Sequence, residues 1–255
     1  MISQTRNSTY KYLAEFFDLM FGAMDDVRDV ARQAVVGPIL SRVKSACDLA
    51  CGTGSTALKL AQHGIRTTAV DLSPGMCRLA RQKARRAAVA VRVIRADMRS
   101  FRLPERVDLV TCEFDALNHV EHKEDLAAVA KSVARALRPG GWFYFDANNK
   151  EGFKRYWKGT LWSEKPGIVM VGRYDNDARN DRAWANVEWF IRDKWGCWKR
   201  RHERVQEVCW SAREIRTVLK KAGFECVRAL DASPFYKSSI ITPGCRTLYL
   251  ARKAP

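Results

Sequence analysis

The fold of this chain is decided by the stretch Ser45-Ala-Cys-Asp-Leu-Ala-Cys-Gly-Thr-Gly54, together with Asp71 at the end of the next apolar segment. An apolar run enters a glycine turn, and a helical pattern begins at Ser55. Glycine allows a tight bend and a close approach of the backbone to a ligand. An acid about 20 residues later, at the next strand end, can bind both hydroxyls of a ribose. The stretch therefore predicts a site for an adenosine-containing cofactor.

Outward from this stretch, short apolar segments alternate with helical patterns. Alternation of this kind indicates right-handed crossovers and a mostly parallel α/β sheet. Ser73-Pro74 starts one helix with an N-cap and a first-turn proline, and Ser211 with Glu214 forms a capping box for another. Strands are expected at 45–50, 66–71, 89–95, 107–112, 142–146, 224–230 and 246–251, and helices at 55–63, from 73, 122–137 and 211–222.

Polar residues follow several of these strands directly. The turn from Asp48 to Gly54, then Asp71, Asp97, Glu113 and Asp146, all fall at strand ends. Open parallel sheets bind their ligands outside the carboxyl ends of their strands. Five polar strand ends on one rim therefore predict the functional edge of the sheet.

Two further segments flank or interrupt this pattern within a single predicted domain, 1–255. Residues 1–40 are expected to form an N-terminal helical cap, with helical spacing over 10–21 and 25–39 and a break at Gly37-Pro38. Residues 150–210 lose the alternation with helices and are expected to form an antiparallel insertion, with strands near 169–171, 185–191 and 204–209.

Composition and charge narrow the possible partners and cellular location of the protein. The chain has 255 residues, 47% of them hydrophobic, and a formal net charge of +17. Such a charge fits an anionic partner or a solvated basic face. The eight cysteines form no Cys-x-x-Cys pair and no cluster with zinc spacing, so no metal is predicted and reduced cysteines are expected. No signal segment opens the chain and no apolar run nears the roughly 20 residues of a membrane helix, so a cytoplasmic protein without membrane contact is expected.

The glycine turn alone leaves two cofactors open. Gly52-x-Gly54-x-x-Ala57 also satisfies the dinucleotide pattern of dehydrogenases. Three features favour a different cofactor: Asp48 on the strand before the turn, a second acid in Ala96-Asp97-Met98, and Leu137-Arg-Pro-Gly-Gly141 before the fifth strand.

With these residues the chain resembles the class I S-adenosylmethionine-dependent methyltransferases. The matching motifs are Asp48-Leu-Ala-Cys-Gly-Thr-Gly54, Val70-Asp-Leu-Ser-Pro-Gly-Met76, Ala96-Asp97-Met98 and Leu137-Arg-Pro-Gly-Gly-Trp142. The resemblance covers about 10–150 strongly and 211–252 in outline. It implies a Rossmann-like seven-stranded sheet of order 3-2-1-4-5-7-6 with helices on both faces, an antiparallel lid at 150–210 and S-adenosylmethionine as cofactor.

The resemblance also implies a role for each matched residue. Asp71 would accept hydrogen bonds from both ribose hydroxyls, and Glu113 and Phe114 would lie under the sulfonium. The family often has Tyr-Asp where this chain has Phe17-Asp18, and Tyr10 or Tyr12 is an alternative source of that hydroxyl. The methionine part would be lined by Asp48, Ala50, Cys51, Gly52 and Gly54, and the adenine by Leu72, Met76, Ala96, Asp97 and Met98.

The segment after the fourth strand supplies candidates for catalysis. An amine or hydroxyl acceptor must lose a proton, and histidine titrates near neutrality. His119 is therefore the predicted catalytic base, with a structural role as the alternative. Acceptor contacts are predicted at Asn118 and Asn148, and in the insertion at Trp162 and Arg173, which would suit an anionic or aromatic acceptor.

The predicted function is methyl transfer to nitrogen or oxygen of a small molecule. No Asn/Asp-Pro-Pro-Tyr/Phe motif follows the fourth strand and no RNA-binding module is recognised, so a nucleic acid acceptor is not favoured. RNA or protein methylation stays open because of the charge, and a non-catalytic cofactor-binding module is the third interpretation.

Overall fold

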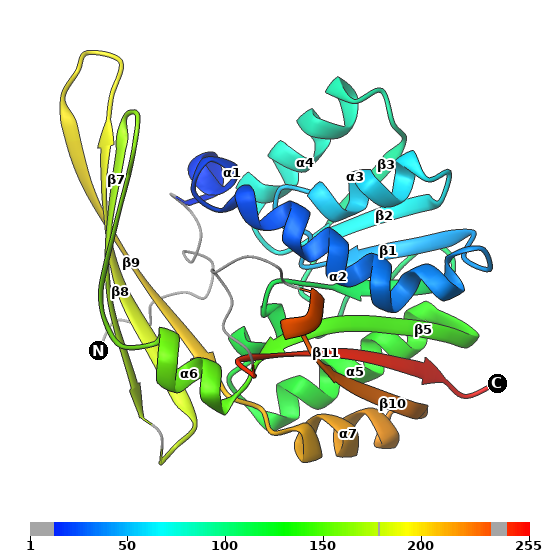
Figure 1. The fold of residues 1–255 in the computed structure, drawn as a ribbon. Helices are drawn as coiled ribbons and strands as arrows, with labels where there is room; N and C mark the ends of the chain where they lie inside the picture. The colour runs from blue at the N-terminus through cyan, green and yellow to red at the C-terminus, as the bar shows by residue number, and fades with distance from the viewer. Residues whose placement is uncertain (1–12, 178, 236–243) are drawn as a thin grey trace.

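The computed structural model describes residues 13–177, 179–235 and 244–255 (Figure 1). Tyr10 and Tyr12 lie outside these residues. The larger sheet contains β1 (Ser45–Leu49), β2 (Arg66–Asp71), β3 (Val91–Arg95), β4 (Val107–Cys112), β5 (Leu137–Asn148), β10 (Phe224–Asp231) and β11 (Arg246–Lys253). The second sheet contains β6 (Gly159–Lys165), β7 (Ile168–Asp177), β8 (Arg182–Arg192) and β9 (Trp198–Val208).

Seven α-helices and three short 3-10 helices are found in the described residues. The α-helices are α1 (Phe17–Phe21), α2 (Ala23–Leu40), α3 (Ser55–Gln62), α4 (Pro74–Arg86), α5 (Lys123–Ala136), α6 (Lys150–Tyr156) and α7 (Ala212–Lys221). The 3-10 helices are η1 (Leu13–Phe16), η2 (Ala116–His119) and η3 (Ser233–Phe235). None of the helices in the described residues combines the length and the hydrophobicity that a membrane crossing requires.

The larger sheet has the order β10-β11-β5-β4-β1-β2-β3. Strands β1 to β5 pair in parallel, and β11 runs antiparallel to both β5 and β10. Counting only the strands of this sheet, the order is the predicted 3-2-1-4-5-7-6, so the fold prediction is confirmed. The carboxyl ends of β1, β2 and β4 are thereby neighbours on one edge.

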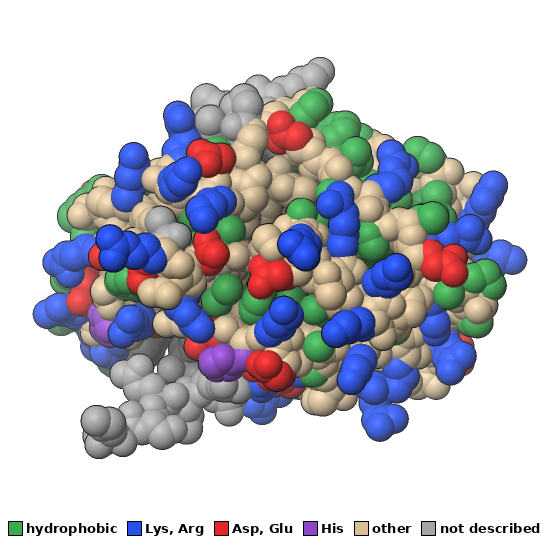
Figure 2. Space-filling view, turned by 90° about the horizontal axis from the view of Figure 1, so that it is seen from below, with side chains coloured by type: hydrophobic (Ala, Val, Ile, Leu, Met, Phe, Trp, Pro, Cys, Tyr) green, Lys and Arg blue, Asp and Glu red, His purple; other side chains and the backbone are tan. Residues whose placement is uncertain are grey.

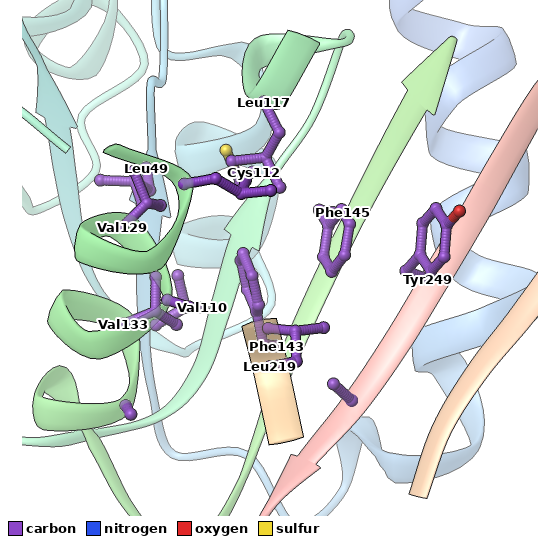
Figure 3. Packing of buried hydrophobic residues seen from close by; sticks show 14 of the residues in the cluster. Leu49, Val110, Cys112, Leu117, Val129, Val133, Phe143, Phe145, Leu219 and Tyr249 are labelled. Carbon is purple, nitrogen blue, oxygen red and sulfur yellow. The ribbon is translucent and has the colours of Figure 1, made fainter. Parts of the chain in front are cut away.

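Alternating side chains of the central strands fill two cores. Phe143 and Phe145 face α5 and α7, where the Phe145 ring stacks on Tyr249 at 4.7 Å between centroids (Figure 3). Tyr144 between them faces the opposite core, which contains the buried face of α2. This alternation follows from the two-residue period of a strand, and it explains why helices cover both faces of the sheet.

Both predicted N-caps are present, but the helix break predicted at Gly37-Pro38 is wrong. The Ser73 hydroxyl accepts from Met76 N, and Ser211 and Glu214 form a reciprocal capping box. Helix α2 continues through Gly37-Pro38 to Leu40. Pro38 lies in the last turn, where its missing N–H removes a single hydrogen bond. Packing of the apolar α2 face, including Val35 and Val36, against the sheet outweighs that loss.

The insertion is more extensive than its sequence pattern indicated. Four antiparallel strands replace the three predicted pieces, and α6 at its start was missed. Asn149 caps α6 by accepting from the N–H groups of Glu151 and Gly152. In Figure 1 the second sheet stands as a separate upright layer beside the larger sheet, with α6 at its foot. The boundaries 1–40 and 150–210 as functional units stay predictions.

Candidate functional site

The glycine turn after β1 bends as its sequence predicted. Gly52 and Gly54 have φ of +54° and +84°. A Cβ on Gly54 would come within 3.0 Å of the Ala80 Cβ, so close packing of α3 and α4 requires glycine there. A Cβ on Gly52 would meet no atom of the described chain within 4 Å, so the turn borders open space. This is the close approach to a ligand that the motif needs.

Strained backbone marks the same edge at two adjacent strands. Ala50 after β1, and Phe114 and Asp115 after β4, have φ of 53°, 63° and 51° although none is glycine. Such conformations cost free energy and concentrate at functional sites. β1 and β4 are neighbours in the sheet, so these three residues border one place.

Asp71 at the end of β2 faces the glycine turn. Its carboxylate accepts hydrogen bonds from Gly52 N at 2.9 Å and from Ser73 N at 2.8 Å. Burial raises the pKa of Asp71, and the backbone N–H groups oppose that shift. The backbone of Leu72 is a third donor, so of the roughly four acceptor sites of the carboxylate about one remains for a ribose hydroxyl.

Asp48 is buried beneath the turn rather than on its surface. Its carboxylate accepts from Ala57 N at 3.1 Å and from Thr111 Oγ1 at 2.9 Å, and its exposed fraction is 2%. Burial, followed by the nearby Glu113, raises the pKa of Asp48 to about 7. Asp48 therefore ties α3 and β4 to β1 and holds a proton near neutral pH.

Glu113, predicted under the sulfonium, forms a buried ion pair with α2. Arg32 Nη1 donates to both of its carboxylate oxygens at 2.9 Å, and Thr56 Oγ1 lies 3.4 Å away. Arg28, one helical turn earlier, places its guanidinium 4.9 Å from the centre of the Phe114 ring. The two arginines are four residues apart, and each follows an acid by three residues, a spacing that indicates ion pairs along a helix. The sequence prediction included neither of them.

The predicted adenine side contains a second ion-pair network. Arg99 pairs with Asp97, with Nε 3.0 Å from both carboxylate oxygens, and its Nη1 also lies 3.2 Å from Asp125. Met98 and Ala96 pack against the core, and Met76 is 4% exposed, whereas Leu72 is 41% exposed. The structure thus places these residues along one border, with Leu72 on its open side.

The short helix α1 covers the glycine turn. Phe17 and Phe21 contact the Phe114 ring at 5.9 and 6.0 Å between centroids. Asp18 accepts from Thr53 Oγ1 at 2.6 Å and pairs with Lys83 Nζ at 2.7 Å. Phe17 stands where the family often has tyrosine, so an aromatic contact replaces a hydroxyl at this position.

A polar cluster lies beside Phe114, where β4, β5, β9 and β11 meet. We define it as Asp115, His119, Asp146, Asn148, Glu207 and Arg246. The distance from His119 Nε2 to Glu207 Oε1 is 3.7 Å, and Arg246 Nη2 lies 2.7 Å from Asp115 Oδ1. Arg246 also pairs with Asp146 and donates to Asn148 Oδ1 at 3.0 Å. Residues far apart in sequence are thereby joined.

The groups of this cluster have perturbed pKa values. Burial lowers the pKa of His119, against the opposing influence of the Asp115 carboxylate. Burial and the neighbouring Asp115 raise the pKa of Glu207 well above its usual range. Arg246 and His119 outweigh burial and lower the pKa of Asp115. His119 is therefore a neutral imidazole beside an ionised carboxylate at neutral pH.

The two asparagines predicted to contact the acceptor, Asn118 and Asn148, have different hydrogen-bond partners. Asn118 is 0% exposed, its amide donates to the carbonyls of Asn148 and Val208, and its oxygen accepts from Asn148 N. These bonds use all of its donors, so we assign Asn118 a structural role in place of an acceptor contact. The Asn148 side chain instead joins the polar cluster and donates to Glu207 Oε2 at 3.4 Å.

Trp162 and Arg173 lie on the wrong face of the second sheet to meet the site. Met170 and Tyr174 on β7 face the core that packs against α1 and α6. Side chains alternate along a strand, so Arg173 points the other way, and Trp162 pairs with Val171 on that same outer face. Trp162 is 61% exposed. An acceptor bound on the core-facing side of this sheet would therefore not contact either side chain.

The residues at the edge fit an adenosine-containing cofactor. Arg28 Nε is buried and has no hydrogen-bond partner among the described residues, and a donor in that state suits a carboxylate such as that of a methionine. The open space at Gly52 and the remaining acceptor site of Asp71 suit a ribose. Asp115, His119 and Glu207 place three ligand atoms within 4.8 Å of one another, but Arg246 already neutralises this group and we assign no metal.

Comparisons with known proteins agree with this geometry. A family model described as a methyltransferase domain matches residues 46–141. The Bacillus subtilis protein YqeM is 36% identical over 103 residues, 40% of this chain and 41% of its own length. The ubiquinone biosynthesis O-methyltransferase of Stutzerimonas stutzeri is 28% identical over 57% of each chain. The chain thus spans about half the length of these curated relatives.

Two solved structures share the fold over nearly the whole chain. An S-adenosylmethionine-dependent methyltransferase from Clostridium acetobutylicum has a TM-score of 0.79 at 23% identity, covering 96% of this chain and 99% of that one. The sugar N-methyltransferase KedS8 from Streptoalloteichus has a TM-score of 0.74 at 23% identity, covering 100% and 96%. Together with the family match over residues 46–141, they agree with the fold predicted from the glycine turn and the strands around it.

Proposed function

We propose that this chain, which matches a methyltransferase domain model over residues 46–141, is a class I S-adenosylmethionine-dependent methyltransferase that methylates the nitrogen of a small-molecule amine. The observation that carries the proposal is His119, held as a neutral imidazole beside ionised Asp115. Both follow β4, on the sheet edge that also contains the glycine turn.

S-adenosylmethionine, when bound, supplies an electrophilic methyl group on a positively charged sulfur. Binding and orientation would come from Asp71 at the ribose, from the turn at Gly52, and from Arg28 at the carboxylate. The cover formed by Phe17, Phe21 and Phe114 would exclude water from this space. Position and a dry site are the main protein contributions to such a transfer.

The polar cluster supports an amine as the acceptor. An ammonium group must lose one proton before its nitrogen can attack, and His119 would accept that proton while Asp115 stabilises the imidazolium. The 23% exposure of the His119 side chain gives the proton a route to water. Asp115 and Asp146 face a single guanidinium, Arg246, so the cluster favours a cationic acceptor over the anionic one expected at first.

The distribution of basic side chains on one face of the molecule does not favour a nucleic acid acceptor. Lysine and arginine side chains are scattered over the whole face seen in Figure 2, with acids between them. Nucleic-acid-binding proteins instead gather such side chains into a patch or stripe. On this face nothing favours a nucleic acid over the small-molecule acceptor that we propose.

A methyl-transfer screen tests the proposal. The full chain is incubated with S-adenosylmethionine labelled in the methyl group, against separate pools of small amines, small phenols and alcohols, and total RNA. Label transferred only to the amine pool supports the proposal, and label in the hydroxyl or RNA pool contradicts it. Absence of thermal stabilisation at saturating S-adenosylmethionine would contradict methyl transfer altogether.

A further inference from the structure

Two carboxyl groups from different layers of the molecule meet at the polar cluster. Asp115 directly precedes η2 in the larger domain, and Glu207 belongs to β9 of the second sheet. A carboxyl oxygen of one lies within 4.8 Å of a carboxyl oxygen of the other. Two carboxyl groups this close and shielded from water are not both ionised, so one of them holds a proton.

The surroundings place that proton on Glu207. Arg246 lies 2.7 Å from Asp115 and keeps its carboxylate ionised. Glu207 is 2% exposed, and its Oε2 atom accepts a hydrogen bond from the neutral Asn148 amide at 3.4 Å. A buried carboxyl that accepts from a neutral amide and adjoins an ionised carboxylate holds a proton, whereas one that binds arginine at hydrogen-bond distance is charged.

The same strand also positions His119. Glu207 Oε1 lies 3.7 Å from His119 Nε2, and the backbone of the preceding residue, Gln206, forms a hydrogen bond with the His119 side chain. Two consecutive residues of β9 thus lie against the imidazole, Gln206 with its backbone and Glu207 with its side chain. Removing this strand would leave Asp115 and His119 attached to η2 without the groups that orient them.

We infer that Glu207 is a neutral positioning residue that donates its proton to Asp115 and thereby completes the His119 site from the second sheet. The inference rests on the proposed function of His119 as the base. It assigns Glu207 no proton transfer to the acceptor, because Asp115 carries the charge that stabilises the imidazolium. The second sheet is then a part of the catalytic unit rather than only a wall around the acceptor.

The charged and titratable groups around Glu207 come from several elements. Asp115 and His119 face it from the η2 segment and Arg246 from β11, with Asp146 on β5 bound to the same arginine. Tyr174 on β7 and Cys209 after β9 are further titratable groups near Glu207. Any test must therefore distinguish the effect of Glu207 on the pKa of His119 from the effect of Asp115 on it.

Histidine titration by NMR makes this separation in the full chain. The chain has 4 histidines, so the His119 signal can be assigned with a His119→Gln variant. Glu207→Gln replaces a neutral donor with another, so the pKa of His119 should stay as in the wild type. Asp115→Asn removes a negative charge and should lower it. A lowered pKa of His119 in Glu207→Gln would overturn the inference, because it would show that Glu207 is ionised.

Glu203→Gln is the matched control. Glu203 lies four residues earlier on the same face of β9, is buried, and accepts from Trp189 rather than from the cluster. Its replacement should leave the His119 titration unchanged and excludes a general effect of altering a buried β9 carboxyl.

The pH dependence of stability gives a second, independent readout. The pKa of Glu207 is raised on folding, so its contribution to stability is complete below its unfolded pKa and is lost as the pH rises toward its folded pKa. The wild type should therefore lose stability relative to Glu207→Gln on going to higher pH. A constant difference between the two proteins would contradict a proton on Glu207. Neither readout needs cofactor or acceptor, so failure here leaves methyl transfer intact, and failure of cofactor binding leaves the pair intact.

Discussion

The Thr53 hydroxyl donates a hydrogen bond of 2.6 Å to Asp18, which fastens the short helix α1 to the glycine turn. Lys83 from α4 binds both residues, at 2.7 Å to Asp18 and 2.8 Å to Thr53. Three elements are therefore joined at the point where the cofactor would be covered.

Replacing Asp18 with alanine should weaken retention of S-adenosylmethionine. The variant loses an acceptor and an ion pair, but the Asp18 side chain is 45% exposed, so solvent screening limits the effect to about 1 kcal/mol. We expect a roughly threefold to tenfold higher Kd, through faster dissociation, in stopped-flow measurements. Glu15→Ala is the control, since it removes an exposed pair with Arg78 from the same cap and should leave the Kd unchanged.

Cofactor binding should release protons near neutrality. Asp48 has a pKa of about 7, and a positively charged ligand next to the turn would favour its ionised form. Affinity should then rise as the pH increases through about 7. Calorimetry in buffers of different ionisation enthalpy measures the release directly. Asp48→Asn should abolish this component, and release that persists in this variant would point to another group.

His119→Ala should lower turnover and leave cofactor affinity unchanged. Loss of a general base costs about 100-fold or more when proton removal limits the rate. In the wild type, activity should fall at acidic pH with a midpoint below the usual histidine value, because burial lowers the pKa of His119. His122→Ala is the control: His122 is exposed and precedes α5. Equal turnover in both variants would remove His119 from the mechanism.

Replacing one of two adjacent residues on β7 should weaken acceptor binding, and replacing the other should not. Arg173 is exposed on the outer face, and Tyr174 faces the core toward α6, with its ring centre 5.6 Å from that of Trp157. Arg173→Ala should leave kcat/KM unchanged, and so should Trp162→Ala. Tyr174→Ala should raise the KM for the acceptor several-fold by loosening this face. A loss confined to Arg173→Ala would restore the outer face as a binding surface.

The sheet and its functional edge were predictable because both depend on local signals. The glycine turn, the acids after β2 and β3, and the caps at Ser73 and Ser211 each occupy a few consecutive residues. Periodicity could also distinguish the insertion from the parallel part. It could not decide where a helix tolerates proline, because the packing of α2 on the sheet decided that.

The partners within the site were not predictable from such signals. Arg32 and Glu113 are 81 residues apart, and Arg246 and Asp115 are 131 apart. Nothing near either arginine in the sequence indicates its partner. The face on which Trp162 and Arg173 lie was not predictable for a different reason: a shift of one residue in strand register exchanges the two faces of a sheet. Only the pairing of β6 with β7 shows which face each side chain occupies.

The position of β11 between β5 and β10 has a consequence for how the protein is made. β5 is complete at Asn148, yet its antiparallel neighbour begins at Arg246, after the whole second sheet and α7. During synthesis on the ribosome, one edge of β5 therefore stays unpaired until nearly a hundred further residues have been added. Nascent chains should be most prone to aggregation and most dependent on chaperones in that interval. Because Arg246 arrives with β11, the polar cluster also cannot be complete before this last strand is made.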